Sequence, residues 1–391
     1  MSEIKISIFR DDLYDNPTYI GSHLCLPATT AEIQDALERA RIDNEHRDFK
    51  VFDYEFKKDY LNELLPQKVS LDELNYLAQR LSGMDSLEKA AYEGVVKMEQ
   101  EPDLVKLINL TYNIANCQVV FEANNDEQLG KFYVDNDFID ELTTVSDEVL
   151  QYIDYEKVGR IRREAEKGVF TSNGYVVQSE SNMEMVYDGT NIPKSDEDTG
   201  HVFELYLIKA CYEPEKAEGV WLKFPADEAE ISSALSKLVA SFDECVFTHC
   251  KSSMSCFNDV FSESEDIEML NTLSNAISKV ISNNMGTKYK AALQYEACTD
   301  LDFAIDIANN LDCYSFYPAL SSPEDYGRQV LLDVTNLPSD DLAFQLLDFR
   351  RYGEAKMKAD DVQSTEYGLI CRSDKAFVFE FCQQPAGQQM T

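Results

Sequence analysis

A stretch of seventeen residues occurs twice in this sequence, and the duplication constrains the fold more than any other feature. The first copy runs from Gly21 to Leu37 and the second from Gly219 to Leu235, at a constant offset of 198 positions. A shared strand and helix pattern explains matching apolar residues, but not the same glycine, proline and glutamate in one register. The chain therefore contains an internal repeat. The identical positions of the first copy are Gly21, Leu24, Pro27, Ala28, Ala31, Glu32, Ile33, Ala36 and Leu37.

The repeated stretch predicts a strand, a proline turn and an amphipathic helix. In the second copy, residues 220–224 alternate between apolar and other side chains before the break at Pro225. Asp227, followed three residues later by Glu230, has the spacing of a helix N-cap and its reciprocal partner. The apolar residues at 231, 234, 235 and 238 then share one helical face.

The repeat extends over nearly the whole chain, with offsets that drift as loop lengths change. Leu74-Asn75 returns as Leu270-Asn271, and Gly130, Gly159 and Gly174 return as Gly327, Gly353 and Gly368. Between the halves lies a stretch that contains glycine, proline and the run Ser195-Asp-Glu-Asp. We therefore expect a first module at 1–190, a linker at 191–200 and a second, more divergent module at 201–391.

Each module is expected to mix strands and helices. Alternation predicts strands at 4–9, 49–56 and 118–121, and helical periodicity predicts helices at 71–81, 86–96 and 102–112. Ser70 and Glu73 have capping spacing for the first of these helices. We also expect a short helix that ends at Gly130, followed by an extended segment at 131–134.

The charge of the chain limits its partners. The sequence has 72 acidic residues against 35 lysines and arginines, a net charge of −37. Direct binding of nucleic acid is disfavoured, because no basic stripe is present to displace counterions. Such a surface suits a basic partner, divalent cations, or a protein whose own groove was built for DNA.

We expect a cytoplasmic protein, from the N-terminal residues, the lack of a long apolar run and the cysteines. The first residues lack the apolar core of a signal peptide, and no run is long enough to cross a bilayer. The ten cysteines are scattered and are expected to be reduced. Cys245, His249, Cys250 and Cys256 are the only cluster with metal-ligand chemistry, but their spacing matches no standard zinc pattern, so we assign no metal and no cofactor.

No catalytic signature is present. The sequence contains no phosphate-binding loop, dinucleotide-binding glycine motif, zinc-protease motif or nucleophile elbow. It has only four histidines, and neither His23 nor His249 repeats as a histidine in the other copy. Catalysis by carboxylates alone stays open, although with 72 acids any chosen pair is a weak signal. We expect that the protein is not an enzyme.

Acidic residues crowd the segment after Gly130. Asp135, Asp137, Asp140, Glu141, Asp147 and Glu148 lie within fourteen positions. Any one of them could be a solvated loop residue or an acid near a helix N-terminus. Their sum is the functional signal: duplex DNA carries one charge per ~1.7 Å, so 37 charges correspond in number to roughly twenty base pairs.

Four segments in order resemble the ArdA-type antirestriction proteins of conjugative elements. They are the stretch from Gly21 to Ile33, the segment Leu71-Asp-Glu-Leu-Asn75-Tyr-Leu-Ala78, the segment Glu127-Gln-Leu-Gly130-Lys-Phe-Tyr-Val134, and Tyr152 to Arg160. The first half matches to about Tyr187. The second half keeps Gly327 and Gly353 but loses some of their neighbours.

This resemblance implies an elongated α+β protein made of small subdomains, whose acidic surface imitates DNA. It implies binding to the methyltransferase core of type I restriction-modification enzymes, without catalysis or cofactor. Because family members look like dimers of one module, we expect this chain to be a monomeric pseudo-dimer. An alternative is an acidic scaffold that holds a different basic partner. The acids expected to bind the partner are Asp126, Glu127, Asp135, Asp137, Asp140, Glu141, Asp147, Glu148, Asp154, Glu156, Glu324, Asp325, Asp340, Asp341 and Asp348.

Overall fold

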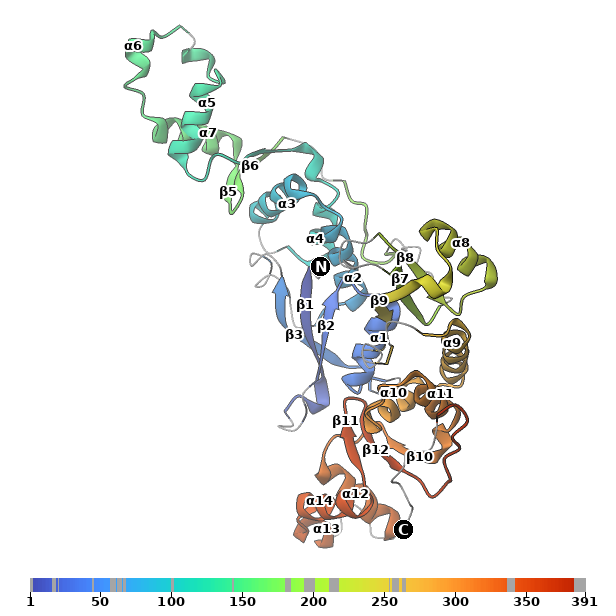
Figure 1. The fold of residues 1–391 in the computed structure, drawn as a ribbon. Coiled ribbons are helices and arrows are strands. Elements are labelled where there is room, and N and C mark those ends of the chain that lie inside the picture. The colour runs from blue at the N-terminus through green and yellow to red at the C-terminus, as the bar shows by residue number, and fades with distance from the viewer. Residues whose placement is uncertain are drawn as a thin grey trace. The chain divides into compact units, whose positions relative to one another are not determined.

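The structure is a computed structural model that describes most of the chain (Figure 1). The described residues are 3–15, 19, 21–43, 46–56, 61, 65, 68–99, 102–142, 144–179, 184–192, 201–210, 218–252, 254, 260–261, 265–335 and 342–382. Most of the expected linker at 191–200 therefore lies outside them, and the module boundaries stay a prediction.

The two repeats contain the same helices and strands in the same order, over the described residues. The elements of the first repeat are β1 (Ile4–Arg10), β2 (Ser22–Leu26), α1 (Thr30–Arg39), β3 (Phe49–Phe56), α2 (Leu71–Ser82), α3 (Ser86–Met98), α4 (Leu104–Leu110), β4 (Cys117–Val120), α5 (Asp126–Asp135), α6 (Asp147–Leu150), α7 (Tyr155–Glu166), β5 (Val169–Thr171) and β6 (Gly174–Gln178). Those of the second are β7 (Phe203–Lys209), β8 (Val220–Phe224), α8 (Glu228–Leu238), β9 (Cys245–Ser252), α9 (Ile267–Ser282), α10 (Gly286–Tyr295), α11 (Leu301–Asn309), β10 (Tyr314–Tyr317), α12 (Pro323–Val334), α13 (Leu342–Leu346), α14 (Phe349–Ala359), β11 (Gln363–Thr365) and β12 (Gly368–Arg372). The expected α+β duplication is thus confirmed.

The strands form small three-stranded sheets. The first sheet of each repeat has its earliest strand in the middle, in the orders β2-β1-β3 and β8-β7-β9. The second sheet has the last strand in the middle, in the orders β4-β6-β5 and β10-β12-β11, and these strands pair antiparallel. Each sheet is too small to be stable alone, so packed helices must supply the rest of its core.

The predicted strand, proline turn and helix are present in both repeats. The bonds Leu26-Pro27 and Phe224-Pro225 are cis. At the N-terminus of α8 the side chain of Asp227 accepts from the backbone N–H of Glu230, whose carboxylate accepts from the N–H of Asp227, as the capping spacing predicted.

A repeated asparagine holds the turn against the next helix. Asn75 on α2 accepts the backbone N–H of Ala28 at 2.7 Å and donates to its carbonyl at 2.8 Å. Asn271 on α9 makes the same two bonds to Ala226, at 2.8 and 3.0 Å. Both hydrogen-bonding groups of the residue after the cis-proline are therefore satisfied by one amide.

We expect Asn75→Ala to lower the free energy of unfolding by about 2–3 kcal/mol, because it leaves a buried N–H and a buried C=O without their partner. Chemical denaturation of the purified chain measures this. Asn271→Ala is the matched variant in the second repeat and should destabilise its own repeat by a similar or smaller amount, since Asn271 is only half-buried. Near-neutral stability of Asn75→Ala would show that the asparagine does not hold the turn.

A helix crosses the second sheet of each repeat and carries a buried tyrosine at the same place. The Tyr92 hydroxyl on α3 donates to the carbonyl of Leu107, and the Tyr289 hydroxyl on α10 donates to the carbonyl of Ala304. Both tyrosines are fully buried. Around Tyr289, the apolar residues of α9, α10 and α11 form one continuous core with β7, β8 and β12.

The chain segment that follows the second sheet of each repeat is hydrogen-bonded by side chains on α4 or α11, or just after the end of that helix. Asn113 and Asn310 each donate to one backbone carbonyl and accept one N–H of that returning chain. One turn earlier, Asn109 accepts the N–H groups of Val186 and Tyr187. In the second repeat its place is taken by Asp306, a buried carboxylate that accepts the N–H groups of residues 380–382. The same backbone path is thus held by an amide in one repeat and by a carboxylate in the other.

A pair of glycines lets two helices pack at backbone contact in each repeat. A Cβ atom built on Gly130 of α5 would lie 1.9 Å from the carbonyl oxygen of Tyr155, and one on Gly159 of α7 would lie 1.8 Å from that of Asp126. Gly353 of α14 has the same relation to Pro323, at 1.6 Å. The prediction that a helix ends at Gly130 and that 131–134 is extended was wrong: α5 continues to Asp135, because this glycine serves the crossing with α7 rather than a helix end.

The chain divides into two compact units. One contains Met1–Ser7, His23–Ala28 and Lys50–Ser195, and the other contains Ile8–Ser22, Thr29–Phe49 and Asp196–Thr391. The helix α1 therefore groups with the second repeat. No helix among the described residues has the length and apolarity needed to span a bilayer.

Candidate acidic interface

The highest density of acidic residues falls on the segment built around α5 and α7. Between residues 122 and 156 the sequence has eleven acids and a single base, Lys131. The matching stretch of the second repeat, 319–350, has six acids and two arginines. The two repeats share a fold but not this charge, so the first carries the more intense acidic surface.

The α5–α7 crossing is the rigid base from which the acids project. From the C-terminal end of α5 the chain runs through a 3₁₀ turn at Asp140–Leu142 and through α6, and then returns along α7 (Figure 1). Asp137, two residues after the end of α5, adopts a left-handed conformation with φ 56°, which aspartate tolerates better than most residues. The exposed acids of this segment are Glu122, Glu127, Asp135, Asp137, Asp140, Glu141, Glu148, Asp154 and Glu156.

Asp126 differs from these exposed acids because it is tied to α7. Both of its carboxylate oxygens accept from Arg163, at 2.7 and 3.0 Å, and its side chain is 19% exposed. Hydrogen bonds from Arg163 lower the pKa of Asp126 below its ordinary value of 3.8. This pair fastens the first turn of α5 to α7, so Asp126 supports the acidic surface and its charge is largely neutralised locally.

We expect Asp126→Asn to destabilise the protein at neutral pH by about 1–2 kcal/mol, because a two-bond charged pair becomes at best a neutral one. The lowered pKa means that the stabilisation is fully present above the unfolded-state pKa of about 3.9 and is lost as the pH falls through the folded-state pKa. Denaturation curves at pH 7 and pH 3 measure the difference. A gap between variant and wild type that does not narrow at pH 3 would contradict the pairing.

Four other predicted interface acids also have structural partners. Asp154 and Asp348 are the N-caps of α7 and α14, each accepting an N–H at 3.0 Å. Asp325 closes the capping box of Ser322 on α12, and Glu324 pairs with Arg328 one turn on. Capping leaves the charge in place, so these acids can still add to the surface potential. Asp340 and Asp341 lie outside the described residues, as does the side chain of Asp147.

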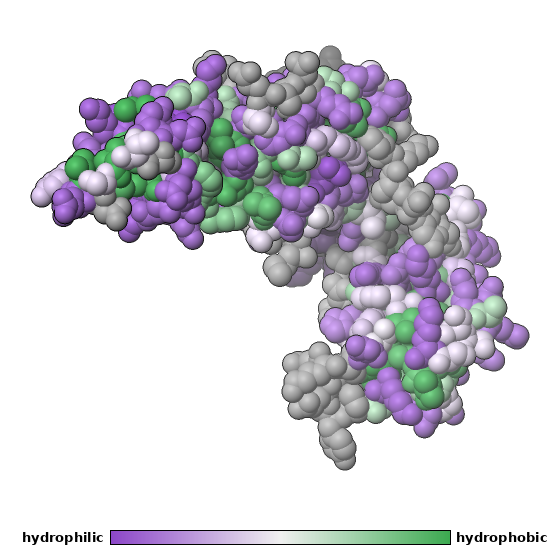
Figure 2. Space-filling view, turned by 90° about the horizontal axis from the view of Figure 1, so that it is seen from above, coloured by the Kyte–Doolittle hydropathy of each residue, from purple (hydrophilic) through white to green (hydrophobic). Residues whose placement is uncertain are grey.

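Apolar side chains are interleaved with the acids, a feature that sequence reasoning missed. Among them, Tyr152 is 82% exposed, and Phe138, Val149 and Ile161 are also exposed. Figure 2 shows that hydrophobic and hydrophilic residues alternate in patches on the face that it draws. Exposed apolar groups beside dense charge are typical of protein-binding surfaces. The local signal was present in the sequence, because residues 138, 149, 152 and 161 break the polar pattern of the segment.

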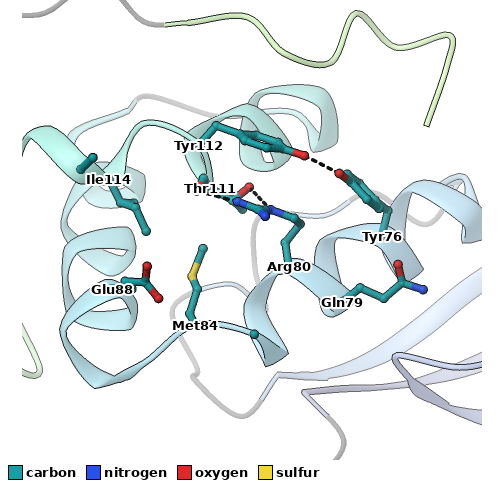
Figure 3. Close-up of a pocket in the computed structure, with 10 residues that line it drawn as sticks. Tyr76, Gln79, Arg80, Met84, Glu88, Thr111, Tyr112 and Ile114 are labelled. Carbon is teal, nitrogen blue, oxygen red and sulfur yellow. Dashed lines mark hydrogen bonds between the residues drawn. The ribbon is translucent and has the colours of Figure 1, made fainter. Parts of the chain in front are cut away.

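A pocket of about 550 Å³ lies elsewhere in the first repeat, between α2 and the end of α4. Its polar groups bind one another (Figure 3): Arg80 donates to the hydroxyl and carbonyl of Thr111 and stacks on the ring of Tyr112, whose hydroxyl bonds that of Tyr76. Burial raises the pKa of Tyr76 to about 12. The carboxylate of Glu88 is occupied by the capping box of α3. None of these lining groups forms a nucleophile with an adjacent base.

The cysteine and histidine cluster lies on β9. Cys245, His249 and Cys250 are in one strand, where the neighbours 249 and 250 point to opposite faces of the sheet. Burial raises the pKa of the Cys250 thiol to about 12, which disfavours the thiolate that a metal requires. Cys256 lies outside the described residues, and no group of metal-binding side chains occurs among those described.

Comparison with known proteins assigns the family. A search of curated proteins found no match. The family model described as "Antirestriction protein (ArdA)" matches twice, over residues 12–177 and 209–371. The two matches cover most of each repeat and agree with the duplication seen in the order of helices and strands. The chain therefore belongs to the ArdA family of antirestriction proteins, which is not an enzyme family, and it carries the family's module twice.

Proposed function

We propose that this antirestriction protein works as an acidic mimic of DNA and occupies the DNA-binding groove of a type I restriction-modification enzyme, at its methyltransferase core. The observation that carries the proposal is the run of exposed carboxylates held by the α5–α7 crossing. Nine acids with exposed side chains lie between Glu122 and Glu156, with only Lys131 to oppose them.

A DNA-binding groove recognises its ligand largely through the charge of the phosphates. Such grooves present lysines and arginines to phosphates, and much of their affinity comes from release of counterions. A protein surface with many closely spaced carboxylates can engage the same cations without any base sequence. The exposed apolar residues beside the acids, such as Phe138 and Tyr152, would add contacts that real DNA does not offer.

The two modules are not equal in this proposal. The first module, proposed at 1–190, carries eleven acids in the segment where the second, proposed at 201–391, carries six. The first should therefore contribute more of the electrostatic attraction. In this proposal one chain supplies two modules, where two chains of a single module each would otherwise be needed. Residues 191–200 are the proposed linker between the modules.

The competing proposal is that the acidic surface binds a different basic protein. Protection of DNA in cells distinguishes this alternative from inhibition of a type I enzyme. Unmodified plasmid is transferred into cells that carry a type I enzyme, with and without this protein. The proposal expects recovery of transfer towards the level seen in cells that lack the restriction subunit. If transfer stays restricted while the protein is well expressed, type I enzymes are not its target. A strain with a type II enzyme of unrelated architecture serves as the specificity control.

A further inference from the structure

A pocket of the first repeat combines one cation with aromatic rings and apolar side chains. It is the pocket of about 550 Å³ between α2 and the end of α4, and its lining lies within one compact unit. Among the described residues that line it, Arg80 is the one cation and Glu88 the one acid, and Met84 and Ile114 are apolar. A volume of this size is typical of sites that hold small organic molecules.

The guanidinium of Arg80 has an edge that the protein does not use. Its Nε atom donates to the hydroxyl of Thr111 at 3.1 Å, and its Nη2 atom donates to the carbonyl of Thr111 at 3.3 Å. These bonds occupy the side of the fork. The end of the fork, between Nη1 and Nη2, has parallel N–H groups that match the two oxygens of a carboxylate. No carboxylate among the described residues pairs with Arg80, although acids outnumber lysines and arginines by 72 to 35 in this chain.

Two tyrosines hold the guanidinium in place. Its Cζ atom lies 4.1 Å from the centre of the Tyr112 ring, and the Tyr112 hydroxyl bonds that of Tyr76 (Figure 3). This stacking fixes the plane of the guanidinium before a ligand arrives, so little conformational entropy is lost on binding. Burial raises the pKa of Tyr76 to about 12, so its hydroxyl stays neutral and does not compete for Arg80 as an anion.

The second repeat lacks the three residues that build this arrangement. At the offsets of 196 and 197 that align the neighbouring asparagines, the places of Tyr76, Arg80 and Tyr112 are taken by Thr272, Ala276 and Asn309. The helices α9 and α11, which correspond to α2 and α4, still pack against each other. The fold therefore does not require the arginine and its two tyrosines, and a role in binding explains their presence in the first repeat.

Glu88 limits the charge that the pocket accepts. Its carboxylate is part of the lining, and one of its oxygens accepts the N–H of Asp85 at 2.9 Å. Repulsion between this carboxylate and a bound anion grows with the charge of the anion. One guanidinium beside one carboxylate therefore favours a ligand with a single negative charge over a phosphate dianion.

We propose that this pocket binds a small organic monocarboxylate with an aromatic or apolar body. The carboxylate accepts the two N–H groups at the end of the Arg80 fork, and the body packs against Met84 and Ile114. Arg80 recognises the charge, the stack on Tyr112 orients it, and Glu88 disfavours a second charge. The inference concerns one unit of the chain and does not depend on the proposed mimicry of DNA.

Nuclear magnetic resonance of the full chain, labelled at the methionine methyl groups, tests the proposal with three probes: hippurate, benzoate and indole-3-acetate. We expect at least hippurate to shift the Met84 signal with a dissociation constant of about 1 mM, an ordinary value for a ligand of this size. The signal of Met185, which is 62% exposed, is the internal control and should not move. Hippuramide, the neutral amide, should bind at least about tenfold more weakly. An unmoved Met84 signal at about 20 mM of every probe, or equal binding of hippurate and hippuramide, overturns the proposal.

A conservative variant tests the fork of Arg80. Arg80→Lys keeps the charge but loses the paired donors, so hippurate should bind about fivefold or more weakly. Tyr112→Phe keeps the ring under the guanidinium and should bind hippurate as the wild type does. Arg160→Ala removes one exposed cation of α7 and controls for net charge. If Arg80→Lys binds hippurate as tightly as the wild type while Met84 still reports binding, the carboxylate does not bind at the fork and the proposal is wrong.

The preference for a single charge has its own test. Phenyl phosphate is mostly a dianion at neutral pH, because phosphate monoesters lose their second proton near about pH 6. The wild type should bind it more weakly than hippurate, and Glu88→Gln should narrow that difference. A wild type that prefers phenyl phosphate overturns the assignment to monocarboxylates. Because none of these measurements involves a restriction enzyme, their failure leaves the proposed function untouched.

Discussion

Replacing Asp135, Asp137, Asp140 and Glu141 with their amides is expected to weaken binding to the type I methyltransferase core by about 1–4 kcal/mol, or roughly fivefold to several hundredfold. Each exposed charge pair that is lost costs about 0.2–1 kcal/mol of binding free energy. All four acids are exposed and lie in the segment around α5 and α7. The fold should be unaffected, since none of the four is buried. Titration calorimetry or fluorescence anisotropy at low salt measures the change.

Salt dependence and a matched variant decide whether the effect is local. If the acids replace phosphates in a basic groove, the slope of log affinity against log salt should fall by about one for each acid that meets a cation. The control neutralises four exposed acids of the second repeat: Asp243, Glu268, Asp374 and Glu380. It changes the net charge equally and should cost much less affinity. Equal losses from both variants would mean that only total charge matters, and loss of all activity from one single substitution would rule out a shared electrostatic surface.

Gly159→Ala is expected to destabilise the first repeat by about 3 kcal/mol or more and to disorder the acidic segment. The new Cβ atom would lie 1.8 Å from the carbonyl oxygen of Asp126, and that oxygen belongs to a helix backbone that cannot rotate away. Alanine favours a helix over glycine by about 1 kcal/mol, but overpacking at this distance costs more. Because α5 and α7 position the acids, affinity for the enzyme should fall with stability.

Another glycine of the first repeat, which lies away from the α5–α7 crossing, provides the control for this variant. Gly83, at the end of α2, has no heavy atom within 3.4 Å of its built Cβ, so Gly83→Ala should be close to neutral. Gly353→Ala should repeat the damage in the second half, where the clash is with Pro323. Hydrogen exchange localises the loss: we expect lost protection in α5 and α7 for Gly159→Ala and in α12 and α14 for Gly353→Ala. Unchanged protection in α5 and α7 would show that the crossing relaxes without cost.

The parts of the fold that sequence predicted well are those governed by local rules. Helix starts followed from capping residues, and Ser70 does accept the N–H of Glu73 as its spacing indicated. The strand, turn and helix around Pro27 and Pro225 could be predicted from the spacing of apolar residues and from the proline that separates strand from helix. The repeat was readable because its invariant residues serve backbone contacts: Asn75 and Asn271 bind a turn, and substitutions there cannot be absorbed by repacking.

Features that depend on distant contacts could not be predicted. Gly130 looked like a helix end, and only the approach of Gly159 from another helix explains why it lies inside α5. The grouping of α1 with the second repeat rests on Lys290, a residue more than 250 positions away that ordinary spacing rules would leave on a surface.

The acidic site could be predicted from the sequence only in part. Crowding of acids after Gly130 was visible in sequence, and the structure leaves Asp135, Asp137 and Glu141 exposed. Sequence alone did not separate those acids from Asp126, which Arg163 binds, or from Asp154, which caps α7. A capping interaction between residues three positions apart can be predicted from their spacing, whereas an ion pair with an arginine on another helix cannot.

Competition with DNA tests the central claim most directly. A type I methyltransferase core is loaded with fluorescent target duplex, and this protein is titrated in at two salt concentrations. The account predicts that duplex is displaced as the protein is added, that displacement is stronger at low salt, and that the endpoint gives the number of chains that replace one duplex. A stable ternary complex of enzyme, DNA and protein, or no displacement at either salt, would contradict mimicry of DNA and assign the acidic surface to another basic partner.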